Sequence, residues 1–131
     1  MKSKLPKKKS ISKLKKELWV LFSKWIRQRD NYTCVTCGHK GEGSGIHAGH
    51  YITKAVGGLG LYFDEHNVHA QCYRCNIHLS GNWTAYREFM LKRYGPEIEQ
   101  ELMQARGKIV KWTEWDYEKN IAYYKEMLST S

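Results

Sequence analysis

Apolar side chains recur with a helical period near the N-terminus of the chain. They are Leu14, Leu18, Leu21, Phe22, Trp25 and Ile26. This spacing fits the α-helical period of about 3.6 residues and places these side chains on one face. Ser12 has a side chain that suits an N-cap, so the pattern predicts a helix over residues 12–29 with its apolar face toward the core.

The middle of the chain has a strand-like pattern. Residues 46–53 and 67–72 predict two short strands, and the glycine-rich stretch 57–60 between them is expected to break any regular element. A helical turn or two is expected over residues 76–81. The pattern therefore predicts a small sheet that follows the first helix.

Helical patterns fill the rest of the chain. A helix is predicted over residues 83–94, with Asn82 as its cap, and Gly95 with Pro96 is expected to end it. A second is predicted over 97–106, and Thr113 with Asp116 predicts a capping box for a last helix over 114–128. We therefore expect an α+β protein with an arm over residues 1–11 and one domain over 12–131.

The composition is that of one soluble domain. The chain has 131 residues, of which 41% are hydrophobic and 13% aromatic, enough to bury a core and to exclude disorder throughout. We expect the five tryptophans to pack in this core or between helices. The apolar stretch at residues 18–22 is far shorter than the roughly 20 residues that cross a bilayer, and no secretory signal pattern follows the basic start. We therefore expect neither a membrane protein nor a secreted precursor.

Positive charge is concentrated at the N-terminus. The chain has 22 basic and 13 acidic residues, a net charge of +9, and residues 1–16 hold eight lysines and no acidic residue. Lysines so close together can displace counterions from a phosphate backbone. We predict that Lys7, Lys8, Lys9 and Lys13 contact nucleic acid, the alternatives being a solvated tail or contact with an anionic membrane.

Four cysteines form two pairs with the same spacing, Cys34 with Cys37 and Cys72 with Cys75. Two such pairs can bring four thiolates to one tetrahedral Zn²⁺. Two disulfides are the alternative, but a chain without a secretory signal is expected in a reducing compartment, which favours zinc. The 34 residues between the pairs exceed the roughly 15–20 of a zinc ribbon, so we expect an inserted unit whose base the zinc clamps.

A second motif lies between and after the cysteine pairs. It consists of His50 on the first predicted strand, Asn67 before the second and Asn76 directly after the last cysteine. This order resembles the HNH, or ββα-metal, nuclease finger. The resemblance implies a zinc-clamped finger over about residues 30–82 and a helical part over 83–128. It also implies that His50 is the general base, that Asn67 holds the loop and that Asn76 binds a catalytic Mg²⁺ or Mn²⁺.

Longer stretches are similar to the NinG (Rap) family of phage lambda recombination endonucleases. These are residues 48–51, 61–72, 76–82, 86–87 and 111–113. That family cuts branched DNA such as Holliday junctions and D-loops. The resemblance implies a DNA endonuclease of phage recombination, acting in the cytoplasm of a bacterial host, and symmetric cutting of both strands suggests a homodimer.

The sequence departs from the broader finger pattern at Gly49, where many HNH proteins place the first metal ligand. His47 is our predicted substitute, because a strand kinked at Gly49 can turn both imidazoles toward one site. His69 is either a ligand or a residue whose hydrogen bond orients one, and His78 is either a ligand, a phosphate contact or part of a helix surface. Arg74 either reaches a phosphate or is merely exposed.

The residues suit phosphodiester hydrolysis. An imidazole with a pKa of about 6.5 is largely neutral at neutral pH, so His50 can take the proton of an attacking water. A hard divalent ion polarises the phosphate and needs few protein ligands. The alternatives are an HNH enzyme that nicks ordinary duplex DNA, a zinc module that binds DNA without cutting it, and an interaction protein of nuclease ancestry.

Overall fold

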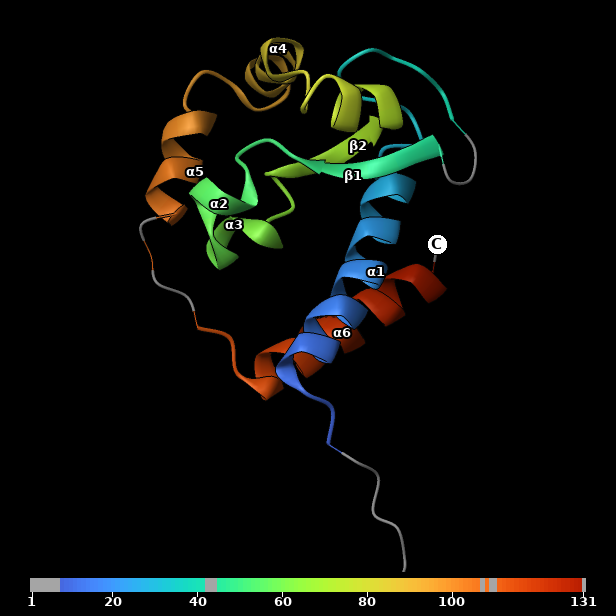
Figure 1. Ribbon diagram of the computed structural model, residues 1–131, viewed down its shortest axis with the longest axis vertical. Coiled ribbons are helices and arrows are strands. Elements are labelled where there is room, and N and C mark those ends of the chain that lie inside the picture. The colour runs from blue at the N-terminus through green and yellow to red at the C-terminus, as the bar shows by residue number, and fades with distance from the viewer. Residues whose placement is uncertain (1–7, 42–44, 107, 109–110, 131) are drawn as a thin grey trace, which may run out of the picture.

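The computed structural model describes residues 8–41, 45–106, 108 and 111–130. In this part of the chain, helices surround a two-stranded antiparallel sheet (Figure 1). The elements in order are α1 (Ile11–Arg29), β1 (Ile46–His50), α2 (Lys54–Gly57), α3 (Leu59–Tyr62), β2 (Val68–Cys72), the π-helix η2 (Arg74–His78), α4 (Trp83–Tyr94), α5 (Ile98–Arg106) and α6 (Glu114–Ser129). The predicted mixture of helices with a small sheet is confirmed.

Helix α1 confirms the predicted N-terminal helix, but the prediction of its cap is wrong. Ser10 has an extended backbone, and its Oγ accepts a hydrogen bond from the Lys13 amide at 3.2 Å, which makes Ser10 the N-cap. Ser12 therefore lies inside the first turn. Of the predicted arm, residues 1–7 lie outside the described residues, and the prediction of nucleic-acid contact by Lys7 lies there too.

The first core lies between α1 and α6, which pack side by side (Figure 1). Each helix has an apolar stripe, and the two stripes pack against each other and against one side chain of β2. The cluster consists of Leu14, Leu18, Phe22, Ile26, Val68, Tyr117, Ile121 and Tyr124. The predicted capping box is confirmed, since the Thr113 and Asp116 side chains each accept a hydrogen bond from the other residue's backbone amide.

The sheet is joined to the C-terminal end of α1. Strands β1 and β2 pair antiparallel from Ile46 opposite Cys72 to His50 opposite Val68. On the other edge of β2, the Asp30 carboxylate accepts a hydrogen bond from the Ala70 amide at 2.8 Å, and Arg29 donates to the Val68 carbonyl at 2.8 Å. These side chains satisfy backbone groups that a third strand would otherwise pair.

The glycine-rich stretch interrupts regular structure at Gly58, which separates two single-turn helices, α2 and α3. Thr53 caps α2, and Gly58 has a φ of 64°, a left-handed conformation that glycine adopts without steric cost. The predicted break is therefore confirmed at Gly58, whereas the short helices on either side of it were not predicted.

Helices α4 and α5 form a second core with the loop after β1. It consists of Tyr51, Leu61, Tyr86, Met90, Ile98 and Leu102. The predicted bounds of α4 are confirmed, but Asn82 does not cap it through its side chain, because its left-handed backbone turns the amide toward the Cys75 thiol at 3.6 Å. Trp83 and Trp115 are exposed, contrary to the prediction that all tryptophans pack inside. None of the described helices is both long and apolar enough to cross a membrane.

Candidate functional site

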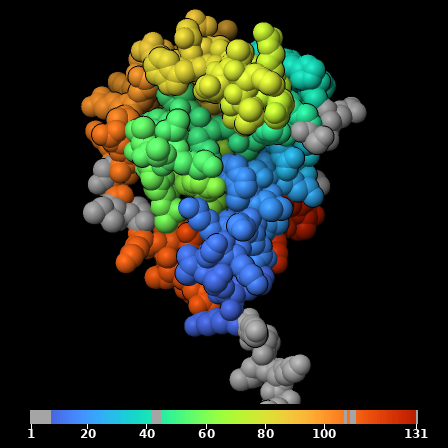
Figure 2. Space-filling view, in the orientation of Figure 1, coloured from blue at the N-terminus to red at the C-terminus, as the bar shows by residue number. Residues whose placement is uncertain are grey.

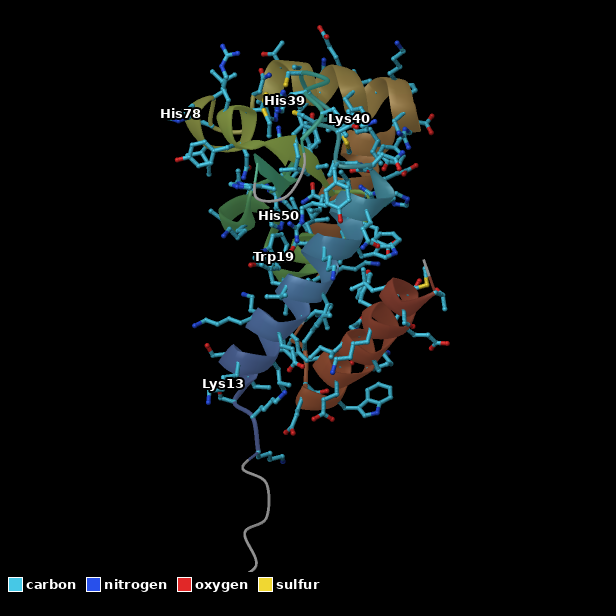
Figure 3. All side chains as sticks on the ribbon, turned by 90° about the vertical axis from the view of Figure 1, so that its right-hand side faces the viewer. Lys13, Trp19, His39, Lys40, His50 and His78 are labelled. Atoms are coloured by element: carbon cyan, nitrogen blue, oxygen red, sulfur yellow. The ribbon has the colours of Figure 1, made fainter. Side chains whose placement is uncertain are left out.

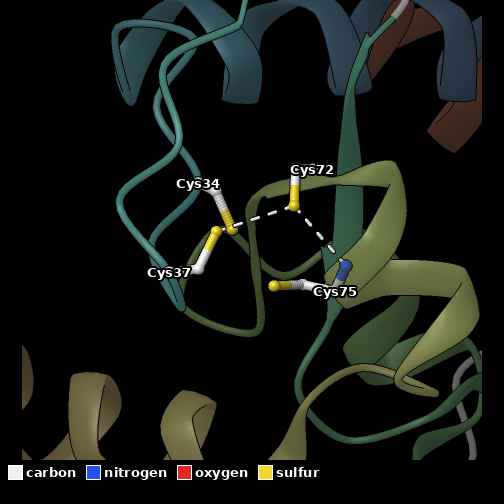
Figure 4. Close-up of side chains that lie close together, drawn as sticks. All are labelled: Cys34, Cys37, Cys72 and Cys75. Atoms are coloured by element: carbon white, nitrogen blue, oxygen red, sulfur yellow. Dashed lines mark hydrogen bonds between the residues drawn. The ribbon is translucent and has the colours of Figure 1, made fainter.

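The four cysteines lie together at one end of the sheet (Figure 4). Their sulfur atoms are all within 4.8 Å of one another, and the Cys37 and Cys72 sulfurs are 3.7 Å apart. A tetrahedral Zn²⁺ with bonds of about 2.3 Å places its sulfurs about 3.8 Å apart. The cysteines are free rather than in the alternative disulfides, and the cluster fits a metal such as zinc.

Two short turns bring the cysteines together. Cys34 and Cys37 lie on a loop after α1, in which the Gly38 amide donates to the Cys34 carbonyl at 2.8 Å. Cys72 ends β2 and Cys75 lies in η2, where the Cys75 amide donates to the Cys72 sulfur at 3.5 Å. Backbone amides that point at the sulfurs stabilise thiolates, and this favours metal binding.

The thiols differ in acidity. Burial raises the pKa of Cys34, but hydrogen bonds from the Thr36 side chain and from backbone amides outweigh it and lower that pKa to about 6. Burial raises the pKa of Cys37 to about 12. Four thiolates repel one another in so small a volume, so they ionise together only when a cation offsets their charge.

A polar pocket of about 590 Å³ lies beside this cluster, between α1, β1 and η2. The surface of α1 adjoins the segment from β1 to α3 on this face of the molecule (Figure 2). The lining side chains combine imidazoles, an amide and cations with an indole ring. They are Trp19, Ser23, Arg27, Ile46, His47, Ala48, His50, Lys54, Asn76 and Ile77.

His50 lies at the end of β1 against α1, next to Trp19 (Figure 3). The His50 and Trp19 rings stack with centroids 5.2 Å apart, and His50 Nε2 is 2.9 Å from the Tyr62 carbonyl oxygen. A carbonyl only accepts hydrogen bonds, so Nε2 carries the proton and Nδ1 keeps a free lone pair. Burial lowers the pKa of His50, Lys54 lowers it further, and the bond to Tyr62 opposes both. His50 is therefore a neutral base at neutral pH.

His47 and Asn76 meet on the same pocket wall. Asn76 Nδ2 lies 3.3 Å from His47 Nδ1, although the two residues are 29 positions apart in the chain. His47 comes from β1 and Asn76 from η2. The structure thus brings together three of the predicted site residues, His47, His50 and Asn76, in one pocket.

Asn67 is fully buried. In the part of the chain that the structure describes, its side chain forms hydrogen bonds only with the backbone of its own loop. Its Oδ1 accepts from the Ile52 amide at 2.8 Å, and its Nδ2 donates to the Ile52 and Leu61 carbonyls at 3.0 and 3.1 Å. These bonds hold the loop from β1 to β2 closed. The position is that of a structural residue, as the resemblance implies.

His69 lies away from the pocket, in the second core. Its Nδ1 is 3.0 Å from the Tyr86 hydroxyl, and its Nε2 is 2.6 Å from the Tyr94 hydroxyl. Tyr86 donates its own proton to the Gly49 carbonyl at 2.7 Å, so His69 Nδ1 must donate to Tyr86 and Nε2 must accept from Tyr94. Both nitrogens are occupied, and burial lowers the pKa of His69 to about 2.

The other predicted contacts lie farther out. Arg74 and His78 are exposed on η2, where His78 contacts the Tyr73 ring. Lys13 lies toward the N-terminal end of α1, far from His50 (Figure 3). Acidic partners occupy Lys8 and Lys9, which lie 3.2 Å from Glu114 and 2.8 Å from Glu17 respectively. None of these five residues lines the pocket.

The sequence interpretation missed the cations in and beside the pocket. Arg27 and Lys54 line the pocket itself. The Lys15 ammonium lies 4.6 Å from the centre of the Tyr62 ring, in a neighbouring hollow that shares Trp19 with the pocket. The available signal was the spacing of Lys15, Trp19 and Arg27, which lie four and then eight residues apart and so along one side of α1.

Comparisons with known proteins agree on one family. The family model described as "Bacteriophage Lambda NinG protein" matches residues 1–130. Protein ninG of Salmonella phage P22 is 36% identical over 105 residues, which cover 79% of this chain and 50% of the relative. Protein ninG of Escherichia phage 933W is 39% identical over 90 residues, and that of Escherichia phage lambda 38% over 90, each covering 68% of this chain and 43% of the relative.

The chain thus spans half or less of the length of these relatives. No solved structure matches it. The family model nevertheless covers almost every residue, including both cysteine pairs and the pocket. The chain therefore belongs to the NinG family of phage proteins.

Proposed function

We propose that this chain is an HNH endonuclease that hydrolyses phosphodiester bonds in branched DNA during phage recombination. One observation carries the proposal. His50, with a free Nδ1, lines the same pocket as the His47–Asn76 pair, directly beside four clustered cysteines. A neutral imidazole, a second imidazole paired with a carboxamide, and four clustered thiols are the groups expected of a ββα-metal finger.

His50 acts as the base. Its Nδ1 takes a proton from a water molecule, whose oxygen forms a bond to phosphorus while the bond from phosphorus to the 3′ oxygen breaks. The departing 3′ oxygen takes a proton from solvent, which leaves a 3′ hydroxyl and a 5′ phosphate. The bond from Nε2 to the Tyr62 carbonyl and the stack on Trp19 hold the imidazole in this tautomer and orientation.

Two metals fit the residues that are present. The cysteine cluster has the donor set and spacing for structural Zn²⁺. In the pocket, His47 Nδ1 and the Asn76 carboxamide oxygen could hold Mg²⁺ or Mn²⁺ weakly, as expected of an ion that keeps most of its waters. When bound, this ion polarises the phosphate and neutralises the charge on the leaving oxygen.

The cations around the pocket suit a nucleic acid substrate. Arg27, Lys54 and Trp19 line the pocket, and Lys15 and Tyr62 line a neighbouring hollow that shares Trp19. Such surfaces attract the phosphate backbone through charge and contact sugars and bases through rings. The branched substrate comes from the resemblance to the lambda recombination endonucleases. A homodimer then follows, because one such pocket cuts one strand at a time.

Cleavage of a labelled four-way junction beside a linear duplex of matched sequence tests the proposal. The zinc-loaded protein is expected to cut the junction when Mg²⁺ or Mn²⁺ is added. His50→Asn keeps a polar group beside the Tyr62 carbonyl and is expected to bind the junction but not cut it. His66→Ala is the matched control, since His66 is exposed and lies outside the pocket lining.

The outcomes separate the alternatives. Equal cutting of junction and duplex would replace the branched substrate with ordinary duplex DNA. Tight binding without cutting would replace the enzyme with a zinc module that only binds DNA. Cutting by His50→Asn at the parental rate would show that another residue is the base.

A further inference from the structure

Gln71 contains a buried polar atom that lacks a partner. This side chain lies near the end of β2, opposite His47 in the register, and is completely buried. Its Nε2 donates to the Gly81 carbonyl at 2.8 Å and to Thr36 Oγ1 at 3.3 Å. Among the described residues, Gln71 Oε1 is the buried side-chain atom without any hydrogen bond.

The orientation of this carboxamide is fixed. Rotating it by a half turn would place its oxygen against the Gly81 carbonyl oxygen and replace a hydrogen bond with a repulsion. A buried acceptor without a donor costs about 1–3 kcal/mol, so native structures satisfy nearly all such atoms. A side chain beside Gln71 Oε1 can supply the missing donor.

Gly49 shows which side chain that is. A Cβ atom built on Gly49 would overlap Gln71 Oε1 and would lie 3.0 Å from Asn76 Oδ1. Two amide oxygens thus face the one side of Gly49 where a side chain would otherwise be. A half turn of the Asn76 carboxamide exchanges its oxygen and nitrogen, which have nearly the same shape. Asn76 Nδ2 then points to Gln71 Oε1, and Asn76 Oδ1 points to His47 Nδ1.

We propose that Gln71 is a positioning residue that holds Asn76 through a hydrogen bond from Asn76 Nδ2 to Gln71 Oε1. Asn76 Oδ1 and His47 then face the pocket together, which gives a divalent cation one oxygen and one nitrogen ligand. Gln71 thereby connects the Gly81 carbonyl to the pocket through a chain of amides. It also explains Gly49, because any side chain at that position would displace the two amides. The ligand role of Asn76 rests on the proposed function, whereas the hydrogen bond does not.

The first test observes the hydrogen bond directly in the unmodified protein. In NMR spectra of ¹⁵N-labelled, zinc-loaded chain, the Asn76 side-chain amide protons are expected to exchange slowly with water and to show contacts to the Gln71 side chain. The side-chain amide of Asn31, an exposed residue, is the reference. Asn76 protons that exchange as fast as those of Asn31 would overturn the proposal, and this measurement needs no variant to fold.

The second test measures the effect on cation binding. Gln71→Met keeps the length of the side chain and removes the acceptor, and it is expected to weaken Mn²⁺ binding to the zinc-loaded chain by roughly 10- to 100-fold. Asn76→Ala should weaken binding at least as much, and the double variant no more than Asn76→Ala alone. Additive losses would overturn the proposal, because they would mean that Gln71 acts independently of Asn76.

The two proposals fail in distinguishable ways. If the unmodified chain binds no Mn²⁺ and cuts no DNA while the Asn76 amide is protected, the proposed function is wrong and the hydrogen bond stands. If the chain cuts DNA while the Asn76 amide exchanges freely, the role of Gln71 is wrong and the proposed function stands.

Discussion

Two histidines on the sheet have different environments although they lie on adjacent strands. His50 keeps a free Nδ1 at the pocket, because its Nε2 is the nitrogen that meets the Tyr62 carbonyl. His69 points into the second core, where the Tyr86 and Tyr94 hydroxyls occupy both of its nitrogens. One imidazole is thus available for proton transfer, and the other is a fixed part of the packing.

The buried imidazole of His69 makes stability depend on pH. Its pKa falls from the usual value to about 2 on folding, so below about pH 6.5 the unfolded chain binds a proton that the folded chain does not. The free energy of unfolding therefore falls as pH decreases through about 6.5, with a slope that approaches about 1.4 kcal/mol per pH unit below that pH. Urea unfolding of the zinc-loaded chain at several pH values between about 7.5 and 5.5 measures this slope.

His69→Gln is the comparison that isolates the effect. Glutamine has no titratable proton in this range but retains a donor and an acceptor for the two tyrosine hydroxyls. Loss of zinc affects both proteins alike, so the difference between their slopes belongs to His69. Equal slopes would contradict the prediction.

At the residue level, sequence reasoning found the side chains whose chemistry is distinctive. The cysteine spacing indicated the metal cluster, and the positions of His47, His50 and Asn76 along the chain indicated residues that the fold brings into one pocket. It missed Gln71 because a glutamine in a short strand has no spacing that sets it apart. Its proposed role comes from the contact of its buried side chain with Gly49, which only the three-dimensional structure shows.

At the level of elements, helix α1 has two functional sides. One side is apolar and packs on α6, and another carries Trp19 and Arg27, which line the pocket, and Lys15, which lines the neighbouring hollow. The N-terminal lysines that sequence reasoning favoured are farther away, and Lys8 and Lys9 are paired with acidic residues. We therefore expect DNA affinity to depend more on the pocket side of α1 than on Lys8 and Lys9.

Paired substitutions test this expectation. Lys15→Ala with Lys54→Ala removes the two cations near the Tyr62 ring, and if each meets a phosphate, the slope of log affinity against log salt should become shallower by roughly 1.8. Lys8→Ala with Lys9→Ala should change that slope less, because acidic partners already offset those charges.

Lys24→Ala is the control, since Lys24 is exposed and half a turn away from Lys15 around α1. Fluorescence anisotropy of a labelled junction between about 50 and 200 mM salt measures each slope. A larger loss from the Lys8 and Lys9 pair would contradict the expectation.

The long elements were predictable and the short ones were not. Helices α1, α4 and α6 have enough turns for an apolar period to show in the sequence. The two single-turn helices and the caps depend on backbone angles of single residues, such as Gly58 and Asn82, which residue type alone does not determine. Ser10 and Ser12 are chemically equal candidates for the cap, and only the backbone conformation selects Ser10.

For the whole molecule, the three core clusters differ greatly in apolar content. The clusters around α6 and around α4 contain many large side chains. The third cluster joins the cysteines to the sheet, and besides the cysteines its buried members are Ile46 and Ala70. So little apolar surface stabilises that region weakly, and a metal bound by the four cysteines would supply most of the free energy that holds the cysteine loop, β1, β2 and η2 together.

We therefore expect metal removal to unfold this region first. The apparent free energy of zinc binding to such sites, about 10–16 kcal/mol, is as large as the whole stability of a typical domain. Chelation should release one zinc ion per chain and abolish hydrogen-exchange protection in residues 34–37 and 68–75, while α1 and α6 retain more protection through their own core. Cys72→Ser should behave like the chelated protein, and added zinc should restore the parent but not the variant. Three thiols alone leave the cluster incomplete. A Cys72→Ser chain that still holds zinc and melts at the parental temperature would therefore show that the four cysteines do not form one metal site.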